Sequence, residues 1–156
     1  MNEVTPRTPA QALEALDAGY ARFLEDLIQA RKTSLNEAVE FFLRYQGNPR
    51  VGAVLDAFAE GLTAHVEELR GLLAACTAEE ADGFAAQALE RMLFYPKPVD
   101  QSVAFSLMAF EGFSAPLLPF LSPEHRAELA KRYQKRNPRR RMLANQKKLL
   151  QQMNEN

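Results

Sequence analysis

The sequence contains no tryptophan and only one cysteine, Cys76, among its 156 residues. A single cysteine forms no intramolecular disulfide, so nothing here indicates an oxidising compartment. The short motifs of catalysis are also missing: there is no G-x-S-x-G, no Walker loop and no glycine-rich dinucleotide fingerprint, and the 7 glycines are scattered. These absences favour a protein without enzymatic activity. An enzyme that uses none of these motifs stays a third hypothesis, because short motifs miss many active sites.

No segment alternates polar and apolar residues for long enough to predict a strand. The N-terminus has no apolar core of the kind found in a signal peptide. The most apolar stretch, 103–121, contains Glu111 and two prolines, which favours a buried helix and a turn over a membrane span. We therefore expect a cytoplasmic protein that does not contact a membrane.

Signals for helix ends are frequent along the chain. Thr8 followed by Pro9 predicts the start of a helix, and "TAEE" at 77 is a capping box that predicts another start. A capping box at Ser34 and Glu37 predicts a short helix. The apolar residues of that helix would be Val39, Phe42 and Leu43.

Further helices are expected at about 50–76, 77–94, 100–114, 123–136 and 139–153, with "YPKP" at 95 and "NP" at 137 as breaks. The sequence thus predicts an all-α fold, a single bundle of about five packed helices followed by one or two basic, amphipathic helices. We divide it into an acidic helical bundle, 1–121, and a basic C-terminal extension, 122–156.

Charge is sharply segregated. Residues 1–128 hold 10 lysines and arginines against 19 acids, whereas residues 129–156 hold 9 against 1. No acid lies within 129–154 to relieve the repulsion among these cations, so relief must come from phosphates, from an acidic protein, or from the acidic body of the same chain.

This asymmetry leads to the functional hypothesis of a regulatory or adaptor protein whose C-terminal segment docks on an acidic macromolecule. Nucleic acid or a nucleoprotein complex is favoured, because arginine predominates in the first half of the run and its fork suits phosphate. Tyr133 is the only aromatic residue of the run, which does not support base stacking. The expected contacts are Arg132, Lys135, Arg136, Arg139, Arg140, Arg141, Lys147 and Lys148.

The same segment carries an apolar stripe that includes Leu143, Leu149 and Leu150, with Gln146 inside it. We expect the three leucines to pack on a partner, on the bundle, or on a second copy in a homodimer through this helix. A polar residue within such a stripe weakens the packing and helps to set its register.

The alternative hypothesis is a helical bundle that binds a small ligand or a metal near His65, Glu68 and Glu111. His65 and Glu68 are three residues apart and so project to one side of a helix, although no second pair of ligands is evident. Glu111 lies in an apolar helix, where it should face solvent, pair with an arginine, or line a pocket. The sequence assigns no catalytic residue, no metal ligand set and no cofactor.

Overall fold

The computed structural model describes residues 7–35, 49–98 and 100–155. Within these ranges every regular element is helical, with six α-helices, two 3-10 segments and no strand, which confirms the predicted all-α class. The α-helices are α1 (Pro9–Leu35), α3 (Pro49–Ala74), α4 (Ala78–Leu93), α5 (Gln101–Ala109), α6 (Pro123–Arg136) and α7 (Ala144–Asn154), and the 3-10 segments are η1 (Glu111–Phe120) and η2 (Arg139–Arg141).

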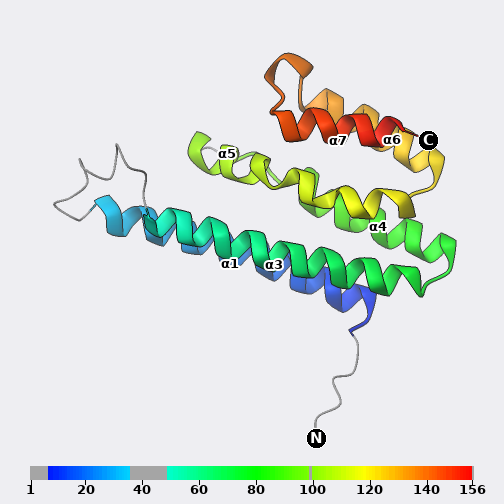
Figure 1. The fold of residues 1–156 in the computed structure, drawn as a ribbon, viewed down its shortest axis with the longest axis horizontal. Helices are drawn as coiled ribbons and strands as arrows, with labels where there is room; N and C mark the ends of the chain where they lie inside the picture. The colour runs from blue at the N-terminus through cyan, green and yellow to red at the C-terminus, as the bar shows by residue number, and fades with distance from the viewer. Residues whose placement is uncertain (1–6, 36–48, 99, 156) are drawn as a thin grey trace, which may run out of the picture.

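The helices form three layers (Figure 1). The long antiparallel pair of α1 and α3 is the first layer, α4 with α5 and η1 is the second, and α6 with α7 is the third. One cluster of buried side chains extends through all three layers and includes Leu16, Leu89, Leu117 and Leu149. The helices that follow residue 121 therefore share a core with the helices that precede it.

Several predicted helix starts are confirmed in atomic detail. The Thr8 hydroxyl accepts the Gln11 N–H at 3.2 Å, and the Gln11 side-chain oxygen accepts the Thr8 N–H at 2.9 Å. Thr77 and Glu80 make the same reciprocal pair, and the Ser122 hydroxyl accepts the His125 N–H at 3.2 Å with Pro123 in the first turn. These side chains satisfy N–H groups that have no carbonyl partner in the first turn of a helix.

The helix start predicted at Ser34 differs from the structure. Helix α1 continues through Ser34 to Leu35, because no glycine or proline interrupts it after Pro9 other than Gly19. The rest of the predicted short helix, with Glu37, Val39, Phe42 and Leu43, lies outside the described residues.

The helix expected at about 100–114 ends earlier, at Ala109, and the chain continues as η1. Pro116 and Pro119 lie inside η1. Each proline lacks the N–H that an α-helix would need at its position, so the tighter and more irregular 3-10 form is adopted instead.

The segment Val103–Phe120 is long and apolar enough to cross a membrane by length and composition. It nevertheless changes from α5 to η1 at Phe110, and both parts contribute to the core through Leu107, Leu117 and Leu118. Glu111, in the middle of the segment, is 1 % exposed and is hydrogen-bonded to side chains of α6 and α7. Part of this segment therefore packs into the core of the protein.

A polar contact joins the second layer to the third. Asp82 of α4 accepts the Ser122 N–H at 2.9 Å and pairs with His125 Nδ1 at 2.8 Å. The hydrogen bond and the charge of Asp82 raise the pKa of His125. Burial by itself would raise the pKa of Asp82, but the bonds from Ser122 and His125 outweigh it and the pKa is lowered.

This pair predicts a pH dependence of stability. Since the folded protein holds the His125 proton more tightly than the unfolded chain does, the stabilisation is fully present below the unfolded pKa of about 6.5 and is lost as pH rises through the higher folded value. We expect the urea midpoint of the wild type to decrease, relative to the midpoint of His125→Gln, as the pH is raised from 6 to 8.5. Two curves that run parallel over this range would show that the pair adds no stability.

Candidate nucleic-acid interface

The basic segment begins on α6 and is interrupted at Asn137 and Pro138. Helix α6 ends at Arg136, Asn137 takes an extended conformation, and the three arginines that follow form the short turn η2. Helix α7 then starts at Ala144, so the helix predicted from 139 is shortened at its start. The cause is the extended backbone of Met142 and Leu143 between the two elements.

The interruption separates the cations into two groups. Arg132, Arg136 and Arg140 are spaced four apart and would stack on one face only of a continuous helix, and the structure leaves only the first two on α6. In η2, with about three residues per turn, successive side chains point about 120° apart. Arg139, Arg140 and Arg141 therefore spread in different directions rather than lining one face.

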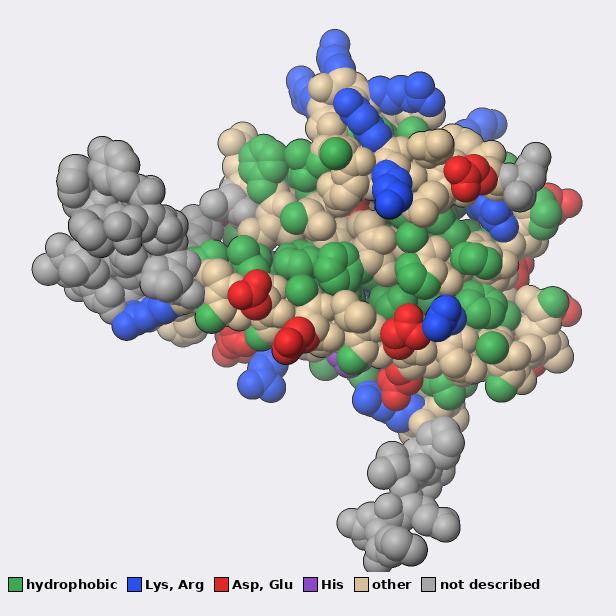
Figure 2. Space-filling model, in the orientation of Figure 1, with side chains coloured by type: hydrophobic (Ala, Val, Ile, Leu, Met, Phe, Trp, Pro, Cys, Tyr) green, Lys and Arg blue, Asp and Glu red, His purple; other side chains and the backbone are tan. Residues whose placement is uncertain are grey.

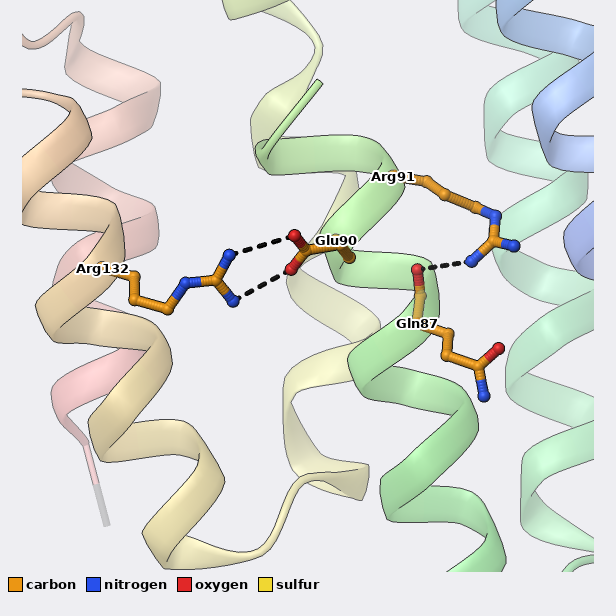
Figure 3. A network of polar contacts seen from close by, with 4 residues as sticks. All are labelled: Gln87, Glu90, Arg91 and Arg132. Carbon is orange, nitrogen blue, oxygen red and sulfur yellow. Dashed lines mark hydrogen bonds and ion pairs between the residues drawn. The ribbon is translucent and has the colours of Figure 1, made fainter. Parts of the chain in front are cut away.

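Arg132 and Arg136 face the body of the protein. Arg132 forms a forked pair with both oxygens of Glu90 on α4, at 2.9 and 3.0 Å (Figure 3), and its guanidinium carbon lies 4.1 Å from the centroid of the Phe94 ring. Arg136 donates to the Tyr95 carbonyl and stacks 4.9 Å from the centre of the Tyr95 ring. Of the eight expected contacts, these two are held by internal partners.

The remaining cations are exposed and, within the described residues, have no carboxylate partner. Figure 2 shows lysine and arginine side chains gathered at the top of the molecule, over α7 and the segment that precedes it. We call this group the basic surface. Its members among the expected contacts are Lys135, Arg139, Arg140, Arg141, Lys147 and Lys148.

A groove crosses the basic surface between η2 and α7. Arg139 and Arg140 line it from η2, and Lys147 lines it from α7. Its floor includes Met142 and Leu150, which are 7 % and 3 % exposed. Glu155 lines the groove as well, so three cations face one acid. This excess of positive charge raises the potential inside the groove, which favours an extended anionic chain over a single ion.

The apolar stripe of α7 is used by the protein itself. Leu149 and Leu150 are 1 % and 3 % exposed and belong to the central cluster, while Leu143 is half-buried. Helix α7 packs on η1 and α6 of the same chain. Leu149 and Leu150 are therefore not available to a partner or to a second copy in this conformation.

Gln146 explains the polar position within that stripe. Its side chain is fully buried, its oxygen accepts the Leu143 N–H at 2.9 Å, and its nitrogen donates to Glu111 at 3.1 Å. The same residue thus caps α7 and fixes its register on η1. Gln146 was predicted to help set the register of the stripe, and the element against which it does so belongs to the same chain.

Glu111 is the centre of a buried network that the sequence did not predict. Tyr133 of α6 donates to it at 2.6 Å, and Tyr95 and Gln146 donate as well. Glu111 does not face solvent and, among the described residues, forms no ion pair with an arginine. It is held by three neutral side-chain donors, an arrangement that none of the three expected alternatives included. The partners come from three separate elements, so sequence spacing gives no signal for them; Gln146 in an apolar stripe was the only hint.

Burial raises the pKa of Glu111, although the bonds from Tyr133, Tyr95 and Gln146 and the charge of Arg136 act in the opposite direction. Burial and the nearby Glu111 raise the pKa of Tyr95 and of Tyr133. Both tyrosines therefore remain neutral O–H donors. The network is a support that holds α6 and α7 on the body, and with them the basic surface.

The residues of the alternative site are not brought together. Glu68 pairs with Arg7 at 3.2 Å, and His65 lies against Gly19 of α1, whereas the bonded partners of Glu111 lie after α4, on α6 and on α7. Burial, followed by the charge of Arg7, lowers the pKa of His65. In the part of the chain that the structure describes, no three histidine, cysteine, aspartate or glutamate side chains are placed to hold a metal ion.

The fold and these contacts define the class of protein: an all-α helical bundle with a basic surface at one end. Comparison with protein families, with curated proteins and with solved structures finds no match.

Proposed function

We propose that this chain is a non-enzymatic regulatory or adaptor protein of the cytoplasm that binds nucleic acid through its basic surface. The observation that carries the proposal is the group of six exposed cations without a carboxylate partner, on a chain whose first 128 residues are acidic. Bringing these cations together costs free energy by mutual repulsion, and a phosphate backbone would relieve it and release counterions.

The same surface supports contact with phosphates rather than with bases. Tyr133 is buried in the Glu111 network, so its ring is not available for stacking. No aromatic side chain lines the groove. Binding of this kind positions a protein on nucleic acid without reading the sequence, and depends strongly on salt.

The first test is the salt dependence of binding to a labelled 20-base-pair duplex, measured by fluorescence anisotropy. If about six cations meet phosphates, log K should fall against log salt with a slope near −5. Replacing Arg139, Arg140 and Arg141 with glutamine should halve the slope and weaken binding at 0.1 M salt by roughly two orders of magnitude.

The charge-matched control replaces Arg7, Arg22 and Arg70 with glutamine. Each of these arginines already pairs with a carboxylate, and exposed pairs of this kind contribute about 0–1 kcal/mol to stability. The control should bind as the wild type does. A slope near zero, or equal weakening in both variants, would contradict the proposal, and binding to polyglutamate but not to the duplex would assign the surface to an acidic protein instead.

A further inference from the structure

A cleft on a different part of the molecule lies between α1 and the connection from α4 to α5. Its walls are mainly apolar and include Leu24, Ile28, Phe94, Val103 and Leu107. The cleft encloses about 720 Å³, within the range of about 300–1,000 Å³ found for small-molecule sites. Ile28 is 47 % exposed, although isoleucine is among the residues most often buried.

The sequence accounts for this cleft. Tyr20, Leu24 and Ile28 are four residues apart and so lie along one face of α1. Pro96 and Pro98 stop α4 from continuing over that face, because proline has no N–H to donate within a helix. The connection after α4 borders the face without filling it, and an apolar hollow is left.

The polar groups of the cleft differ in whether they already have partners. Arg91 pairs with Asp17 at 3.0 Å, Glu90 pairs with Arg132 at 2.9 Å, and Asp100, which also lines the cleft, accepts the Val103 N–H at 3.3 Å. In contrast, neither the Tyr20 hydroxyl nor the exposed Lys97 ammonium has a hydrogen-bond or ion-pair partner among the described residues. Burial raises the pKa of Tyr20, so its hydroxyl remains a donor. The two unused groups are thus both donors, and one of them is positively charged.

We infer that this cleft binds a long-chain carboxylate, with its carboxylate at Lys97 and its alkyl chain along Leu24, Ile28 and Leu107. The apolar walls favour an alkyl chain, since removing methylene groups from water is favourable. The unpaired cation selects an acid over an alcohol or an amine. This function is separate from nucleic-acid binding, because none of the cleft residues belongs to the basic surface.

The experiment is a titration of the full chain with 11-(dansylamino)undecanoic acid, a fluorescent carboxylate, with displacement by decanoate or decanol. We expect saturable binding of one probe per chain, with decanoate displacing it at least tenfold better than decanol. Ile28→Glu, which places a negative charge in the apolar cleft, should weaken binding at least tenfold. The matched control is Phe105→Glu, which changes a 57 % exposed residue outside the cleft and should bind as the wild type does.

Lys97→Gln tests the carboxylate assignment, with Lys148→Gln as its control. We expect the advantage of decanoate over decanol to disappear in Lys97→Gln and to persist in Lys148→Gln. The inference is overturned if no saturable binding is seen, if Ile28→Glu and Phe105→Glu behave alike, or if decanol competes as well as decanoate with the wild type. Circular dichroism checks that Ile28→Glu is folded, and Ile28→Asn replaces it if it is not.

Discussion

Replacing Glu111 with leucine is expected to lower the free energy of unfolding by about 3 kcal/mol. The change leaves the Tyr133 hydroxyl buried without an acceptor, and it leaves the Gln146 amide only its long bond of 3.4 Å to Asn137; a lost acceptor of this kind costs about 1–3 kcal/mol. Relief from burying a carboxylate offsets part of this loss. Urea unfolding followed by circular dichroism at pH 7 measures the change, with Glu60→Leu on the exposed face of α3 as control.

Glu111→Gln separates the charge of this residue from its hydrogen bonds. Glutamine keeps the shape and an acceptor oxygen, so most of the network is retained. Because the folded protein binds the Glu111 proton more tightly than the unfolded chain, wild-type stability should decrease as pH rises from about 4.5 through the higher folded value. In Glu111→Gln that decrease should be absent. A leucine variant as stable as the wild type would show that the network does not hold the third layer in place.

The second large effect is expected from Leu149→Ala. Leu149 is 1 % exposed within the central cluster, and leucine-to-alanine changes at such sites cost about 3–5 kcal/mol through lost burial and the cavity left behind. Leu143→Ala, at a half-buried position on the same segment, should cost about 1 kcal/mol. Chemical unfolding of the isolated protein measures both changes.

This pair of variants also decides what the apolar stripe of α7 is for. If Leu149 packed only on an outside partner, its removal would leave the stability of the isolated chain unchanged. A large loss places α7 within the folded core, as the packing of α7 on η1 indicates. Equal and small effects of the two substitutions would contradict that arrangement.

The buried Glu111 network holds in place the segment that carries the basic surface. Tyr133 and Gln146 anchor α6 and α7 through Glu111, and the segment between them carries η2. The arginines of η2 are thus displayed on a connection whose two ends are fixed. A surface held in this way loses less conformational entropy on binding than a free tail of the same composition.

What the sequence by itself determined is the class of fold and most helix starts, because caps, prolines and apolar spacing act within a few residues of one another. Thr8, Thr77 and Ser122 are examples in which a local side chain decides where a helix begins. The excess of positive charge after residue 128 is equally a property of the sequence.

Only the tertiary structure decided which charges are already paired and which apolar residues are already covered. Arg132 meets Glu90 across 42 positions of the chain, and Gln146 meets Glu111 across 35. Such contacts depend on how helices dock, which no local pattern encodes. The burial of Leu149 has the same cause. An amphipathic stripe predicts that another element covers it, but only the docking of the helices decides that this element is η1.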